Sequence, residues 1–195
     1  MRTITIIFVF LSALSFAQDS KKFSVELKGN TFAGLGNNFI AEGTTTFTGF
    51  GLGLTGMVYN NFGLGIEFNR GYADVKDVSV FGELNSPELT LIDLYGLYRF
   101  PATSKLDIEG NVGAGNLRIK SRTDYRSDDF LESGSTFFLG GKLLYSITKN
   151  DQLHVVGGSR LYFLSTITEM DDPEIDEYYS KATLLNFSFG LRLYF

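Results

Sequence analysis

The residue types that acyl-transfer and metal chemistry require are scarce in this sequence. It has one histidine, His154, and no cysteine, which excludes disulfides and thiolate sites and argues against a histidine-based metal centre. A serine hydrolase needs a serine, a histidine base and an acid that orients it. In an extended strand Ser159 faces away from His154, whereas Ser146 and Glu109 could share its face. An imidazole within a polar network is the simpler interpretation, so we assign no catalytic residue.

A second candidate site is the acidic stretch at residues 166–181. Its carboxylates could bind Ca²⁺, which accepts oxygen ligands in flexible geometries. They are Glu169, Asp171, Asp172, Glu174, Asp176 and Glu177. The spacing does not match an EF-hand loop, and the glycine needed for its sharp turn is missing. Charge runs of this kind are usually solvated, so Ca²⁺ binding stays open and we predict no metal ligand and no cofactor.

A third set consists of ten charged residues that alternate with apolar ones in the middles of extended segments. The acids are Glu26, Glu67, Asp93, Asp107 and Glu109, and the bases are Lys28, Arg99, Lys142, Arg160 and Arg192. Five negative charges cancel five positive ones. Whether these side chains meet water or one another depends on the elements that hold them.

The first 17 residues are predicted to be a secretory signal peptide. Met1–Arg2 gives a positive start, residues 3–16 are nearly all apolar, and Ser15-Phe16-Ala17 supplies small residues before a cleavage site after Ala17. The apolar run is too short for a transmembrane helix, which needs about 20 residues. Residues 18–195 then form a single domain.

The mature chain alternates apolar and polar residues with period two, which predicts strands with one apolar face. We expect eight strands, at about residues 22–32, 46–58, 62–72, 89–100, 105–118, 135–147, 152–165 and 182–195. Short turns at 59–61, 101–104 and 148–151 alternate with long polar loops at 33–45, 73–88, 121–134 and 166–181. Transmembrane barrels show this asymmetry, with short periplasmic turns and long outer loops.

The charged residues decide which way the strands face. A soluble barrel would turn them outward to water, and a lipocalin-like carrier would also need an apolar cavity and usually a tryptophan, which this chain lacks. A membrane barrel turns its apolar face to lipid and pairs the charges inside. Eight strands leave an interior that side chains just fill. We therefore predict an all-β, eight-stranded antiparallel up-and-down transmembrane β-barrel with a packed ion-pair interior.

The signal peptide, the alternating strands and the terminal Asn186–Phe195 segment together resemble the small outer-membrane β-barrels of the OmpA transmembrane-domain and OmpX type. The resemblance covers essentially the whole mature chain. It implies that a terminal aromatic preceded by alternating hydrophobics is a signal for the barrel-assembly machinery. The residues concerned are Phe187, Phe189, Leu191, Leu193 and Phe195. The OmpA peptidoglycan-binding domain has no counterpart in this sequence, so that anchoring role is not inherited.

Two functional hypotheses remain. The first is a structural or interaction protein of the outer membrane that contacts lipids and lipopolysaccharide and presents four long loops to an extracellular ligand. The second is a narrow channel or a lipid-modifying enzyme, although acyl chemistry on lipid A is expected at the outer rim, far from His154. A filled, neutral interior favours the first. A net charge of −5 argues against nucleic acid as a partner.

Overall fold

The structure, a computed structural model, describes residues 23–122, 130–166 and 171–195, and the predicted signal peptide lies outside these ranges. Within them the strands are β1 (Phe23–Leu35), β2 (Phe47–Tyr59), β3 (Phe62–Tyr72), β4 (Asn85–Pro101), β5 (Leu106–Arg122), β6 (Phe130–Ser146), β7 (Leu153–Thr166) and β8 (Lys181–Tyr194). Each pairs antiparallel with the next and β8 pairs with β1, so the sheet closes. The prediction of an eight-stranded up-and-down barrel is confirmed.

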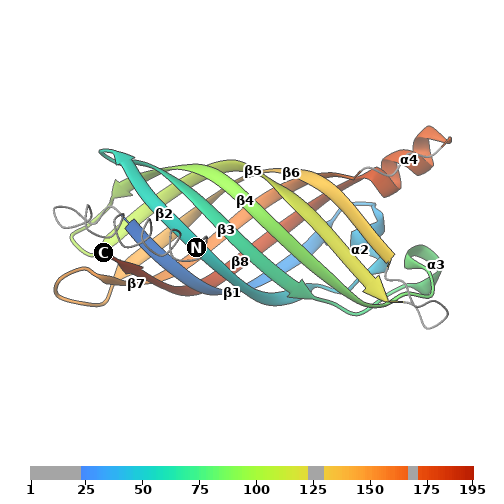
Figure 1. Cartoon of the computed structure of the whole chain (residues 1–195), viewed down its shortest axis with the longest axis horizontal. Coiled ribbons are helices and arrows are strands. Elements are labelled where there is room, and N and C mark those ends of the chain that lie inside the picture. Colours follow the sequence, from blue (N-terminus) through green and yellow to red (C-terminus); the bar gives the residue numbers. More distant parts are fainter. Residues whose placement is uncertain (1–22, 123–129, 167–170) are drawn as a thin grey trace, which may run out of the picture.

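The two ends of the barrel differ as the loop lengths predict. The short turns lie at the end that carries the C-terminus, and the helices lie at the opposite end (Figure 1). These are α2 (Phe39–Gly43), α3 (Val78–Phe81) and α4 (Pro173–Ser180). We call the two ends the short-turn end and the long-loop end. In the described ranges, no helix is long and apolar enough to cross a bilayer.

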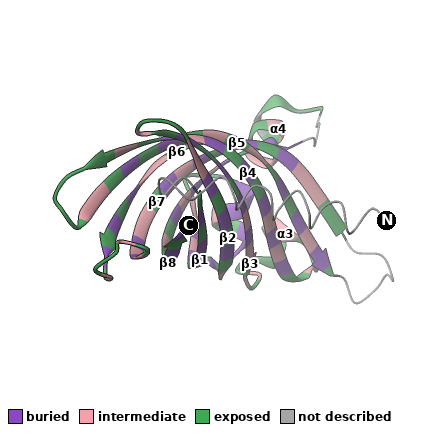
Figure 2. Ribbon diagram, turned by 60° about the vertical axis from the view of Figure 1, so that its left-hand side comes forward, coloured by how far each residue is buried: buried purple, intermediate pink, exposed green. Residues whose placement is uncertain are grey.

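Burial alternates along the strands, as Figure 2 shows, because successive side chains of a strand point to opposite faces of the sheet. In β8, Phe187 and Phe189 are 55% and 69% exposed, whereas Arg192 is fully buried. Over the part of the strands nearer the short turns, the aliphatic and aromatic residues therefore face outward and the charged ones lie within. This is the arrangement that a transmembrane barrel requires.

Four strands extend three or more residues further toward the long-loop end than the sequence pattern predicted. β1 ends at Leu35, β4 begins at Asn85, β5 ends at Arg122 and β6 begins at Phe130, whereas the predicted boundaries were 32, 89, 118 and 135. The extra residues continue the hydrogen-bonded ladder, with Ser121 opposite Phe130. Near this end of the strands the alternation reverses, since Leu117 and Ile119 are buried inside while Arg118 is exposed outside. The predicted strands were too short because they were identified by outward-facing apolar residues, which stop where the alternation reverses.

Candidate functional site

The charged residues meet in the half of the barrel nearer the short-turn end. Glu26 of β1 is one centre of the cluster, with Lys142 Nζ 2.7 Å and Arg192 Nη2 2.6 Å from its carboxylate oxygens. Lys28 Nζ lies 3.7 Å away. All four side chains are almost completely buried. The Glu26–Arg192 contact joins the first strand to the last, because β1 and β8 pair in that register.

Glu67 of β3 forms the second centre. Its carboxylate receives Lys28 Nζ at 2.6 Å, Arg160 Nη1 at 2.8 Å and Lys142 Nζ at 3.3 Å. Because Lys28 and Lys142 contact both glutamates, the two centres form one connected network. Buried charges are tolerated when they are paired and hydrogen bonded in this way.

The network continues at both of its ends. Toward the short turns, Glu109 pairs with Arg192 at 2.7 Å and with Arg99 at 3.2 Å. Toward the long loops, Asp93 lies 3.5 Å from Arg160 and accepts a hydrogen bond from the Tyr162 hydroxyl at 2.8 Å. Charged side chains thus run continuously through this half of the interior.

Asp107 is the one member of the predicted set that stays outside the network. It is half-buried at the start of β5, beside the short-turn rim, and forms no ion pair with the part of the chain that the structure describes. The connected network therefore holds four acids and five bases rather than five of each. A carboxylate at the rim can be solvated by water, so it does not need an internal partner.

Aromatic rings pack against the network inside the barrel. The Arg160 guanidinium lies 4.7 Å from the ring centroids of both Tyr95 and Phe138, at cation–π distance. Gly65, opposite on β3, leaves the space that the Tyr95 ring occupies, since a Cβ there would overlap it. An inward glycine thus leaves room for an aromatic ring inside the barrel.

Nearer the long-loop end the interior becomes apolar, a feature that the sequence reasoning missed. Nine inward-facing strand residues of this half are buried, and Phe39 and Ile40 of α2 lie buried among them. The strand residues are Phe32, Phe47, Leu89, Leu91, Leu117, Ile119, Leu164, Ala182 and Leu184. The signal that could have revealed this core is the reversed alternation at the strand ends, as in Leu117-Arg118-Ile119-Lys120.

The helices pack over the apolar core and hold one another. The Phe39 ring stacks on Phe81 of α3 at 6.5 Å and on Tyr179 of α4 at 6.0 Å. The Tyr178 hydroxyl donates a hydrogen bond to Glu42 Oε2 at 2.8 Å. Partial burial and this carboxylate raise the pKa of Tyr178 to about 12. Three loops distant in sequence are thereby fixed over the barrel mouth.

A polar cavity of about 310 Å³ opens at the short-turn end, lined in part by Ser146, Asp151 and His154. His154 is buried, lies directly opposite Ser146 and packs its ring edge against Tyr194 at 4.8 Å. The Ser146 hydroxyl lies 2.7 Å from Asp151 Oδ1. Ser159 is exposed on the outer face, as the parity argument expects.

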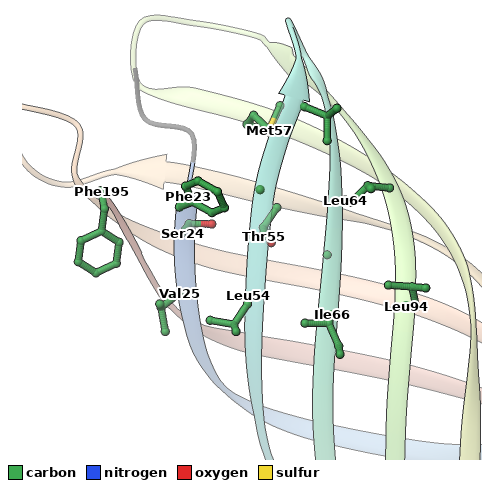
Figure 3. Close-up of a pocket in the computed structure, with 13 residues that line it drawn as sticks. Phe23, Ser24, Val25, Leu54, Thr55, Met57, Leu64, Ile66, Leu94 and Phe195 are labelled. Atoms are coloured by element: carbon green, nitrogen blue, oxygen red, sulfur yellow. The ribbon is translucent and has the colours of Figure 1, made fainter. Parts of the chain in front are cut away.

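The outer surface carries a groove of about 550 Å³ at the short-turn end (Figure 3). Its walls are almost entirely apolar, and they include Phe23, Leu54, Ile66 and Phe195. Gly56 keeps the groove open, since a Cβ there would come within 3.1 Å of the Phe23 ring. The Phe195 amide donates to the Phe23 carbonyl oxygen at 2.9 Å, so the last residue completes the seam between β8 and β1.

The acidic stretch at 166–181 is described only in part, since residues 167–170, which include Glu169, lie outside the described ranges. Among the described residues, no three histidine, aspartate or glutamate side chains gather to hold a metal ion. Glu177 instead pairs with Lys181 at 3.3 Å. The described part of this stretch gives no geometric support for a Ca²⁺ site.

No protein-family model and no curated protein sequence matches this chain. Solved structures do match it. Neisserial surface protein A is 12% identical with a TM-score of 0.68, and the match covers 90% of this chain and 98% of that one. A major outer membrane protein of Thermus thermophilus is 14% identical with a TM-score of 0.59, covering 89% and 98%. OprG of Pseudomonas aeruginosa is 13% identical with a TM-score of 0.52, covering 89% and 95%. The chain has the fold of the small outer-membrane β-barrels.

Proposed function

We propose that this chain is a structural or interaction protein of the outer membrane, exported by a cleaved signal peptide, whose barrel is a closed anchor and not a pore. The observation that carries the proposal is the filled interior. Ion pairs occupy the half nearer the short turns, and apolar side chains under α2 occupy the other. A conducting path for ions would have to displace one or both layers.

The outward-facing apolar residues support the membrane location, because a surface of this kind is stable only when lipid covers it. The three packed helices support the interaction role. Loops fixed to one another present a surface whose ordering entropy is already lost before a ligand arrives, which favours binding. The extracellular partner would therefore meet the α2–α3–α4 surface, while lipids contact the strands.

The experiment is a planar-bilayer recording with the refolded protein, with bilayers that received detergent alone as the blank. We expect no discrete conductance steps above the blank. Reproducible single-channel steps from the folded wild type would contradict the closed-anchor proposal and favour the channel hypothesis. Fractionation of the producing cells tests the location separately.

The enzyme hypothesis retains one supporting observation, the Ser146, Asp151 and His154 cluster at the short-turn cavity. A mass spectrum of lipid A from cells that overproduce the protein tests it, with His154→Ala as the matched control. We expect the same spectrum from the wild type, the variant and the empty strain. A wild-type modification that His154→Ala abolishes would assign catalysis to this cluster instead.

A further inference from the structure

Cations on the outside of the barrel gather on one side of its long-loop end. In the described ranges, the outward-facing cations of the strand ends are Arg70 of β3, Arg118, Lys120 and Arg122 of β5, and Lys181 of β8. Lys181 pairs with Glu177. The other four lie on two strands separated only by β4, in a chain whose net charge is −5. This cluster of positive charge is opposite in sign to the net charge of the whole protein.

The registers place two of these arginines in one row. Arg70 lies directly opposite Thr90 of β4, Thr90 lies opposite Arg118, and Arg118 lies opposite Ser133 of β6. We call these four residues the cationic row. Adjacent strands are about 4.8 Å apart, so the row spans roughly 14 Å. Its side chains are two guanidinium groups and two hydroxyls, all donors to a phosphate oxygen.

The arginines keep donors available for such a ligand. Arg70 pairs with Glu88 and lies 5.6 Å over the Tyr72 ring, which orients the guanidinium. Arg118 is exposed and forms no ion pair with any described residue. A guanidinium has five N–H groups, so one carboxylate leaves Arg70 able to bind an anion.

The surface below the row suits acyl chains. The next outward row toward the middle of the strands consists of Phe68, Ile92, Asn116 and Ser135, so it is apolar on β3 and β4 only. The row after it is apolar throughout and contains Ile66, Leu94, Ala114 and Phe137. Ile66, Leu94 and Phe137 are 49%, 65% and 50% exposed. An amphiphile that lay along these strands would place its chains on the apolar rows and its headgroup at the cationic row.

We propose that the cationic row binds the phosphorylated headgroup of an outer-leaflet glycolipid, with the acyl chains of that lipid on the rows below. The assignment rests on the outer-membrane location proposed above, since the long-loop end then lies in the outer leaflet. Two arginines and two hydroxyls across four strands fit a headgroup with more than one phosphate better than a single small anion.

The test is native mass spectrometry of the refolded, detergent-solubilised protein titrated with bis-phosphorylated lipid A. Each arginine lost should weaken binding about fivefold, from the contribution of one cation near a charged lipid surface. Arg118→Gln and the double variant Arg70→Gln/Arg118→Gln should show this, while Arg118→Lys should retain most of the affinity. Lys105→Gln is the matched control, because it removes a cation at the opposite rim and should have no effect.

Two further lipids identify the source of the phosphate. Dephosphorylated lipid A should bind more weakly than the bis-phosphorylated form, and phosphatidylglycerol should show little dependence on the cationic row. Equal affinity of the wild type and the double variant, or an equal loss in Lys105→Gln, would overturn the proposal. Tight binding of phosphatidylglycerol that the double variant abolishes would overturn the glycolipid assignment.

Folding of each variant is checked on an SDS gel. A folded barrel migrates differently before and after boiling, and each variant should keep this difference. Because the readout is affinity in detergent, it is independent of where the chain resides in the cell. Failed outer-membrane fractionation would remove the proposed location without changing the measured affinities, so the two failures are distinguishable.

Discussion

The two halves of the barrel interior differ in the side chains that dominate them. Near the short turns the ion-pair network lies beside a small apolar cluster of Leu144, Val156 and Tyr194, and the outside is apolar. Near the long loops the interior is apolar and the outside carries Arg118. The first half is arranged for lipid outside and the second for water or headgroups outside. The same strands therefore have the side-chain pattern of a membrane protein in one half and that of a water-soluble protein in the other. The medium around each half determines whether its outward-facing or its inward-facing residues are apolar.

The halves are also expected to contribute differently to stability. Apolar burial contributes directly, at about 25 cal/mol per Å². A buried ion pair has to offset the desolvation of both charges, so the pair as a whole adds little, but the loss of one partner is costly. The charged half should therefore be the more sensitive to single substitutions, and the apolar half the more dependent on side-chain volume.

The largest effect is expected in the charged half. Arg192→Leu would leave Glu26 and Glu109 short of a partner in the interior and should lower the free energy of unfolding by about 3–5 kcal/mol. Urea unfolding of the refolded protein in detergent measures it, with Lys149→Leu, in an exposed turn, as the control. Equal midpoints for the two variants would end the claim that charge pairing holds this half together.

The next effect belongs to the apolar half. Leu184 is fully buried while its neighbour Leu185 faces outward, so the pair compares the two media within one strand. Leu184→Ala should cost about 2–5 kcal/mol, because the core cannot refill the space completely. Leu185→Ala should cost clearly less, since lipid or detergent closes around the shorter side chain. If both substitutions shift the urea midpoint equally, the inside–outside distinction at this level is wrong.

The smallest effect on stability concerns the seam that encloses both halves. Deleting Phe195 removes a half-exposed outward ring and one hydrogen bond to Phe23, at most about 1.5–3 kcal/mol of burial. If the terminal aromatic is part of an assembly signal, the deletion should lower outer-membrane abundance in cells far more than it lowers the in vitro midpoint. Cell fractionation and urea unfolding on the same variant make the comparison. Normal abundance would leave lipid contact as the role of this residue.

Most of the fold followed from two patterns in the sequence. The period-two alternation predicts which face of each strand is apolar. The alternation of short and long loops predicts which strand ends lie at the same end of the barrel. The strand 62–72 was predicted with the bounds that β3 shows. The predicted strands corresponding to β4, β5 and β6 were too short, because the prediction followed outward apolar residues and stopped at Leu89, Arg118 and Ser135, near which the medium changes and the parity reverses.

The candidate site was predictable only in part. Parity places Glu26 and Arg192 on the inner face of their strands, but their contact depends on the register between β1 and β8, which the turns set and the alternation does not. Strand alternation also could not predict the helices that pack over the long-loop end of the barrel. Phe39, Phe81 and Tyr179 lie in polar loops at wide spacings, and only the three-dimensional approach of those loops makes them neighbours.

The connectivity of the ion pairs has a consequence for how the barrel forms. Arg192 is 166 residues from Glu26, and Lys142 is 116 residues from it, so Glu26 stays without these partners until the later strands are in place. Contacts of such high sequence separation form late in folding. Glu67 can pair early with Lys28 of β1, but Glu26 must keep its water of hydration until Arg192 arrives on β8. Closure of the barrel and removal of water from around Glu26 are then one event.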